Sequence, residues 1–270
     1  MLGAIIGDIV GSRYEWANIR QKQFQLFKRQ CSVTDDSVMT LAVAKSLLEA
    51  ESLEDLPACA VRNMQALGRK YPRAGYGGRF YDWLFSDDPH PFNSWGNGAG
   101  MRVSPCAWKA GSLEDALTLS DAVTGVTHNH PEGMKGARAV TSAVFLARSG
   151  CSMEEIRRHI EDHYYRLDFT LDGIRKTYRF DVSCQGSVPQ AIEAFLESTG
   201  FEDAVRNAVS IGGDSDTIAA MAGAMAEAYW GIPESIRKAA MGFLDEDMKA
   251  ILAAFESRYP GKTIPDEDMT

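Results

Sequence analysis

The sequence lacks a long apolar run and an excess of positive charge. Its most hydrophobic segment, 218–226, is interrupted by Glu227, well short of the roughly 20 apolar residues that a membrane-spanning helix needs. The amino-terminal stretch is apolar but has no basic leader of the kind found in signal peptides. The formal net charge is −9, whereas a general nucleic-acid binder needs a basic face. We therefore expect no membrane span and no general nucleic-acid binding.

Cysteine and histidine are few and scattered. The five cysteines form no C-x-x-C pair, which favours reduced thiols in a cytoplasmic protein over a disulfide framework or a zinc ribbon. His159 and His163 are four residues apart, but the glutamate of an H-E-x-x-H motif is missing. The expected location is the cytoplasm, and a zincin site is not indicated.

Strand patterns are nearly absent, and helical patterns dominate. Alternation of apolar and polar residues is confined to 177–182. The apolar residues of the first ten positions fall at helical spacing and predict a core helix that ends near Gly11. No low-complexity segment or linker divides the chain, so the sequence predicts one all-α domain over 1–270. Nine further segments have a 3.6-residue period: 37–50, 56–67, 112–124, 132–147, 152–164, 189–196, 201–209, 217–230 and 233–243.

Two clusters of acidic and threonine side chains lie immediately before apolar helical segments. An acid at a helix start is ordinarily a cap or a partner of the helix dipole. The segment 218–226, however, is apolar on nearly every side, so its start is expected inside the protein or at the floor of a cleft. Ionised carboxylates there need hydrogen bonds or a cation. The clusters are Thr34, Asp35 and Asp36, and Asp214, Asp216 and Thr217.

The repetition of this pattern favours a shared metal site. If the two helix starts converge, they offer four carboxylates and two hydroxyls, which are hard oxygen ligands suited to Mg²⁺ or Mn²⁺ rather than zinc. Four carboxylates exceed the charge of one divalent ion, which favours a two-ion site.

The region 71–105 is the longest irregular stretch, and loops of that length usually have a function. Its glycine-rich parts, 75–80 and 93–105, offer backbone amides that could cradle phosphate oxygens, although glycine pairs are also ordinary turn signals. Trp95 either stacks on a base or packs against the protein. A lone histidine such as His128 is more often structural than catalytic.

Taken together, these motifs resemble those of the ADP-ribosylglycohydrolase family. The resemblance implies a compact all-α domain of orthogonal helices that binds two Mg²⁺ ions, with Mn²⁺ as a possible substitute. It also implies cleavage of the bond between the anomeric carbon of ADP-ribose and an acceptor. The matching segments are "GAIIGDIVGSRYE" (3–15), "TDDSVMT" (34–40), "GYG" (75–77), "GNGAGMR" (96–102), "THNHPEG" (127–133), "SVPQAI" (187–192) and "GGDSDTIA" (212–219).

The resemblance also assigns roles to individual residues. The partner it implies is ADP-ribose or an ADP-ribosylated protein or small molecule, with the acceptor open among arginine, serine, a nucleobase and O-acetyl-ADP-ribose. Glu15 is the implied catalytic or gating acid, and Asp35, Asp36 and Asp214 share the catalytic centre. The implied metal ligands are Thr34, Asp35, Asp36, Asp214, Asp216 and Thr217. The implied ADP-ribose contacts are Gly77, Asn93, Ser94, Trp95, Asn97, Gly98 and His128.

Local sequence alone leaves other interpretations open. The local sequence, with Glu15 beside Arg13, favours a solvated surface acid at this position. Only the family motif favours a catalytic acid instead. The same aspartates would also serve a metal-dependent phosphohydrolase, which releases phosphate or AMP instead of intact ADP-ribose. A non-enzymatic ADP-ribose-binding or structural protein of the same fold is the third alternative.

Overall fold

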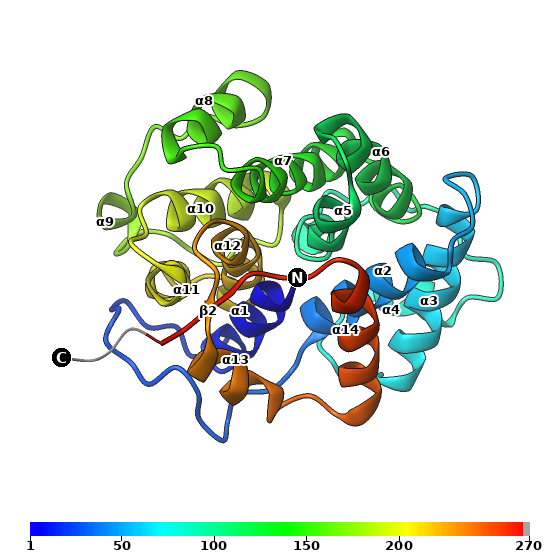
Figure 1. Cartoon of the computed structure of the whole chain (residues 1–270), viewed down its shortest axis with the longest axis horizontal. Coiled ribbons are helices and arrows are strands. Elements are labelled where there is room, and N and C mark those ends of the chain that lie inside the picture. The colour runs from blue at the N-terminus through cyan, green and yellow to red at the C-terminus, as the bar shows by residue number, and fades with distance from the viewer. Residues whose placement is uncertain (267–270) are drawn as a thin grey trace.

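Helices make up almost all of the regular structure in the computed structural model, which describes residues 1–266 (Figure 1). Two short strands, β1 (Ile232–Pro233) and β2 (Thr263–Ile264), pair in parallel. The helices are α1 (Leu2–Ser12), α2 (Asp35–Glu49), α3 (Leu56–Lys70), α4 (Gly78–Phe85), the 3₁₀ turn η1 (Asn97–Ala99), α5 (Ser104–Lys109), α6 (Leu113–Thr124), α7 (Pro131–Arg148), α8 (Met153–His163), α9 (Leu171–Ile174), α10 (Cys184–Leu196), α11 (Phe201–Ser210), α12 (Ser215–Tyr229), α13 (Glu234–Met241) and α14 (Glu246–Arg258).

The all-α prediction is confirmed, and every segment predicted as a helix contains one. The sequence predicts no helix at α4, α5, α9 or α14. Of these, α4 and the start of α5 lie inside the region 71–105 that was expected to be irregular. Three of the four missed helices are eight residues or shorter, and such segments are too short for a helical period to be distinct.

Two local predictions are wrong. The segment 177–182 is not a strand; it is irregular, and only the next residue, Ser183, forms an isolated bridge with Gly96. Helix α10 begins at Cys184, not at Pro189, because the Ser183 hydroxyl accepts a hydrogen bond from the Gly186 amide and starts the helix earlier. Pro189 is therefore inside the helix, where it leaves the Gln185 carbonyl without its helical donor.

Helix α12 lies at the centre of the fold, against α1, α7, α10 and α11 (Figure 1). The backbones of α1 and α12 approach so closely that side chains cannot fit between them. A Cβ atom on Gly7 would lie 1.9 Å from the Ala219 carbonyl oxygen, and one on Gly11 would lie 2.5 Å from the Asp216 Cα. This contact brings the end of α1 to the amino terminus of α12, where the second acidic cluster begins.

One connected cluster of buried apolar side chains extends from Met1 to Phe255. The assignment of 1–270 to a single domain stays a prediction, and 267–270 lie outside the described residues. Within residues 1–266, no helix combines the length and the apolar character needed to cross a bilayer.

Candidate active site

A cavity of about 530 Å³ opens over the amino termini of α2 and α12. Loops around 15, 75–80, 92–102, 128 and 180–182 form its walls. Three of the predicted site residues, Thr34, Asn93 and Trp95, do not line it. The predicted residues that do line it are Glu15, Asp35, Asp36, Gly77, Ser94, Asn97, Gly98, His128, Asp214, Asp216 and Thr217.

At the floor of the cavity is a cluster of carboxylates that includes Asp36 from the first predicted motif and Asp214 and Asp216 from the second, but not Asp35. One oxygen each from Asp8, Asp36 and Asp216 lie within 4.8 Å of one another, and so do one oxygen each from Glu15, Asp214 and Asp216. In the described part of the chain, none of these five acids forms an ion pair with a lysine, arginine or histidine. Such a concentration of buried negative charge calls for a cation.

Asp8 is a site residue that the sequence reading did not assign. It is fully buried on α1, and its carboxylate accepts hydrogen bonds from the Thr34 amide at 3.0 Å, the Thr34 hydroxyl at 2.5 Å and the Ser37 amide at 3.1 Å, and also from the Ser37 hydroxyl. Asp8 therefore holds the start of α2 in place. The available signal was a single carboxylate in an otherwise apolar helix, which is costly to bury without partners.

Burial and mutual repulsion raise the pKa values of the cluster. Burial, followed by the neighbouring carboxylates, raises the pKa of Asp35 to about 8. Burial, followed by the charge of Asp214, raises the pKa of Glu15 to about 7. The pKa values of Asp36 and Asp216 are raised well above the ordinary range for the same two reasons. Each shift records how unfavourable ionisation is without a compensating cation.

Helix capping does not account for the two acidic motifs. Thr34 and Asp214 occupy the N-cap positions of α2 and α12, but neither side chain makes a capping hydrogen bond. The Thr34 hydroxyl donates to Asp8, whereas the Asp214 carboxylate accepts from the Asn97 side-chain amide at 2.7 Å. One oxygen of Asp36, Oδ1, is buried and has no hydrogen-bond partner among the described residues. A buried carboxylate oxygen without a donor fits a metal ligand.

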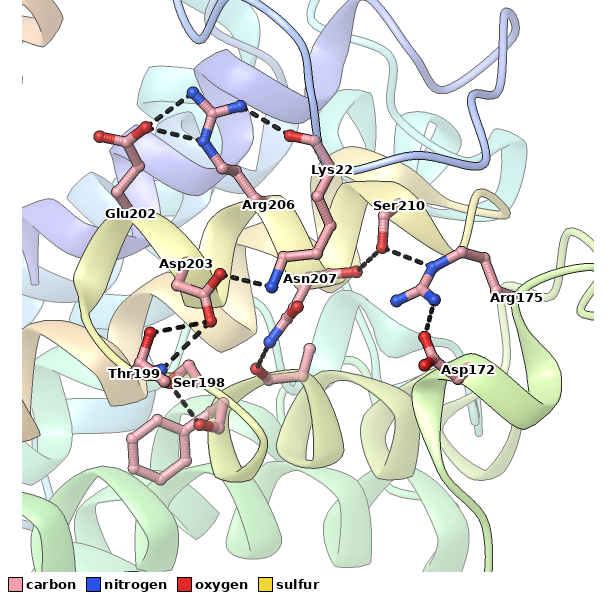
Figure 2. Close-up of polar contacts among 12 residues, drawn as sticks. Lys22, Asp172, Arg175, Ser198, Thr199, Glu202, Asp203, Arg206, Asn207 and Ser210 are labelled. Atoms are coloured by element: carbon pink, nitrogen blue, oxygen red, sulfur yellow. Dashed lines mark hydrogen bonds and ion pairs between the residues drawn. The ribbon is translucent and has the colours of Figure 1, made fainter.

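Glu15 is not a solvated surface acid. It follows α1 in a half-buried bend and lines the cavity. The Asn18 side chain ties this bend to the turn before α12, because its amide donates to the carbonyls of Glu15 and Gly213 and accepts from the Gly213 amide. Farther along the same segment, Lys22 pairs with Asp203, and Arg206 donates to the Lys22 carbonyl at 2.7 Å (Figure 2).

Aromatic side chains that the sequence reading did not assign also line the cavity. Trp16 is 80% exposed and stacks on Phe180 with ring centroids 5.2 Å apart. Trp95, in contrast, lies outside the cavity lining with its ring 5.3 Å from that of His130. Asn93 does not line the cavity, and its φ of 55° is the only positive value outside glycine in the described chain.

Comparison with known proteins places this site in a family. The sequence model of the ADP-ribosylglycohydrolase family matches residues 1–261, and the chain belongs to that family. A solved structure described as an "ADP-ribosylglycohydrolase-related protein complex" has the same fold, with a TM-score of 0.70 and 24% identity, over 96% of this chain and 95% of that one.

Three curated relatives are similar along most of their length. Human ADP-ribosylhydrolase ARH3 is 27% identical, covering 93% of this chain and 90% of the relative. ADP-ribosylarginine hydrolase Tri1 of Pseudomonas putida is 24% identical, covering 89% and 73%. The ADP-ribosyl-[dinitrogen reductase] glycohydrolase of Rhodospirillum rubrum is also 24% identical, covering 86% and 85%. The family and these relatives support ADP-ribose hydrolase activity.

Proposed function

We propose that this protein is a divalent-metal-dependent hydrolase that cleaves the anomeric bond of ADP-ribose conjugates in the cytoplasm. The observation that carries the proposal is the convergence of both acidic motifs and Glu15 at one end of a cavity whose walls include glycine-rich loops. The partner is ADP-ribose attached to a protein or to a small molecule. The name of one relative specifies arginine and that of another specifies dinitrogen reductase, and the acceptor of this protein is a variable of the experiment below.

The donor set fits two Mg²⁺ ions, or Mn²⁺ in their place. All donors are oxygen atoms, the charge is concentrated, and Asp36 has an oxygen without a partner, as hard divalent cations require. Such ions lower the pKa of bound water and neutralise developing charge. The residues proposed to hold them are Thr34, Asp35, Asp36, Asp214, Asp216 and Thr217.

The protein itself contributes a proton-transfer group. Burial is the first cause of the raised pKa of Glu15, which is about 7 in the metal-free protein, and a buried carboxyl group with a raised pKa suits a general acid or base. The bend that carries Glu15 is anchored to the turn before α12 through Asn18. Its carboxylate is thereby held beside Asp214, at the end of the cavity where we place the anomeric carbon.

The remainder of the cavity suits the ADP-ribose moiety. Backbone amides of the glycine-rich loops would offset the charge of the diphosphate in an otherwise acidic protein. We propose that Gly77, Ser94, Asn97, Gly98 and His128 contact the ligand, because all five line the cavity. Asn93 and Trp95, which do not line it, are proposed to act through the shape of the loop.

The test is hydrolysis of a panel of ADP-ribose conjugates linked through arginine, serine, a nucleobase and an acetyl ester. Each substrate is assayed with Mg²⁺, with Mn²⁺ and after chelation. We expect release of intact ADP-ribose from at least one substrate and loss of turnover after chelation. Release of phosphate or AMP would establish a phosphohydrolase instead. Tight binding of ADP-ribose without turnover of any substrate would point to a binding protein.

A further inference from the structure

A buried arginine, Arg102, is among the residues that line the cavity beside its glycine-rich wall. Arg102 has no exposed surface, and burial lowers its pKa to about 10. No carboxylate pairs with it within residues 1–266, and its Nε and Nη1 atoms have no hydrogen-bond partner there. Its Nη2 atom donates to the Thr127 hydroxyl at 2.6 Å and lies 3.4 Å from His128 Nδ1. The guanidinium carbon lies 5.5 Å from the centre of the Phe80 ring, but a buried cation without a carboxylate partner remains unfavourable.

The hydrogen-bond inventory around Arg102 determines the tautomer of His128. The Thr127 hydroxyl lies 2.7 Å from His128 Nδ1 and already accepts from Arg102. If Nδ1 carried a proton, that proton would face a guanidinium that can only donate. The Thr127 hydroxyl hydrogen would then also have no acceptor among the described residues. Both conflicts disappear when Nδ1 accepts from Thr127 and the proton is on Nε2.

The surroundings also keep His128 uncharged. His128 is 5% exposed, and burial, followed by the charge of Arg102, lowers the pKa of its ring well below the ordinary value. The nearest rings are Phe80 and Phe92, with centroids 6.5 and 6.0 Å away. Neither ring carries a charge that could stabilise an imidazolium, so Arg102 is the charged group that governs this histidine.

The Nε2 atom faces a gap that two glycines leave in the wall of the cavity. A Cβ atom on Gly98 would lie 3.2 Å from His128 Nε2, and one on Gly96 would lie 3.7 Å from it. No hydrogen-bond partner for this nitrogen occurs in the described protein, and His128 lines the cavity. The missing side chains therefore leave an imidazole N–H open to a ligand.

We propose that Arg102 and Thr127 are positioning residues that fix His128 as the neutral Nε2–H tautomer, so that it donates a hydrogen bond to an oxygen of ADP-ribose between Gly96 and Gly98. The identity of the ligand rests on the proposed function, whereas the tautomer does not. With the proton fixed on Nε2, His128 donates a hydrogen bond without adding charge to the site. The fixed proton also prevents the ring from accepting a proton that Glu15 must supply or remove.

The tautomer is tested by ¹⁵N nuclear magnetic resonance of the histidine ring nitrogens. In the wild type, Nδ1 should have the shift of an unprotonated nitrogen and Nε2 that of a protonated one, unchanged from about pH 5 to 8, where an ordinary histidine titrates. An imidazolium or an Nδ1–H ring at neutral pH would overturn the proposal. This measurement uses the wild-type protein and does not depend on the folding of any variant.

The role of Arg102 is tested with Arg102→Met. Replacement of a buried charge by an apolar side chain of similar length is often tolerated, so we expect a folded protein. Without the guanidinium, Thr127 can either donate or accept, so the His128 spectrum should show a mixture of the two neutral tautomers, while burial still holds the pKa of the ring below its ordinary value. A folded variant that keeps the wild-type spectrum would remove Arg102 from the proposal.

The donor role of His128 is tested with Gly98→Ala, which places a methyl group in front of Nε2. Loss of one hydrogen bond to a charged oxygen should weaken ADP-ribose binding about 10- to 100-fold in calorimetric titration. Gly200→Ala is the matched control, because a Cβ there meets no atom within 4 Å. Equal affinity of Gly98→Ala and wild type would refute the contact with His128. Absence of ADP-ribose binding by the wild type would refute the proposed function and leave the tautomer to the spectrum.

Discussion

Two kinds of helix start occur in this protein, although they look alike in sequence. At α6, α8 and α14, the N-cap side chains of Ser112, Ser152 and Asp245 accept a hydrogen bond from a backbone amide of the first turn. At α2 and α12, Thr34 and Asp214 occupy the same position without making that bond. Their oxygens are directed to the cavity floor or to residues that support it.

The difference shows how acidic side chains at a helix start remain free to bind a cation. At the start of α2, Asp8 reaches over from α1 and accepts from the Thr34 and Ser37 amides, and the Asp35 amide donates to the Ala74 carbonyl. At α12, the Asp216 carboxylate accepts from the Thr217 amide. At α2, acceptors supplied from elsewhere in the structure leave the motif's own Asp36 open to a cation; at α12, one oxygen of the motif's own Asp216 is used in this way.

Asp216→Asn should have the largest effect, because Asp216 belongs to both carboxylate triads. Changes to groups that only support a metal ligand weaken metal binding about 10- to 100-fold. Loss of a ligand itself should weaken metal binding by more than that and abolish turnover. The metal-free variant should be no less stable than the wild type, since a source of repulsion is gone. Calorimetric titration with Mg²⁺ and Mn²⁺ is the measurement. Asp245→Asn, which keeps an ordinary cap, is the control. Wild-type metal affinity in Asp216→Asn would end the two-ion proposal.

Glu15→Gln should separate catalysis from metal binding. The substitution removes the carboxylate and keeps its shape, so ADP-ribose affinity should remain close to that of the wild type. Single-turnover hydrolysis should slow by about 10²- to 10⁴-fold, the usual contribution of a general acid or base. A variant with the wild-type rate would mean that Glu15 has no part in proton transfer.

The sequence was informative where a pattern is local. The period of apolar residues located the long helices, and the two acidic motifs stood out because charge preceded apolar runs. Short helices such as α4 and α9 were missed because eight or fewer residues give too little periodicity. The strand prediction for 177–182 is wrong because the alternation reflects apolar side chains at the cavity rim, where Phe180 and Val182 are exposed.

The site could be predicted only as far as its motifs extend. Asp8 supports Thr34 across 26 positions of sequence, and that contact exists only because α1 packs beside α2. Likewise, Trp16 lines the cavity whereas Trp95 does not, and local sequence does not distinguish the two tryptophans. Residues of this kind become identifiable only when the packing of α1, α2 and α12 is known.

The pH dependence of stability should differ between metal-free and metal-bound protein. Unfolded carboxyl groups release their protons near pH 4, whereas the folded, metal-free protein holds them on Asp8, Glu15 and Asp35 up to about pH 6, 7 and 8. The folded state thus binds more protons between about pH 4 and 8, and its stability should fall as the pH rises. Saturating Mg²⁺ should suppress this fall and raise the melting temperature most at the alkaline end. The measurement is the melting temperature at about pH 5 and pH 8, with chelator and with Mg²⁺. An equal melting temperature of the chelated protein at the two pH values would contradict the prediction.

Ser112→Ala should have the smallest effect and should leave the site untouched. The Ser112 hydroxyl accepts from the Asp115 amide at 3.1 Å on an exposed surface, so its loss should lower the free energy of unfolding by about 1 kcal/mol. Mg²⁺ affinity and turnover should not change, because α6 contributes no residue to the cavity lining. Ser112→Asp, which retains a capping oxygen, should restore the stability.

Thr34→Ala replaces an N-cap hydroxyl that is bonded to Asp8 and Asp36. We therefore expect it to lower the affinity for Mg²⁺ as well as the free energy of unfolding. If Thr34→Ala behaved like Ser112→Ala in urea unfolding and in Mg²⁺ titration, the two kinds of helix start would be one kind after all.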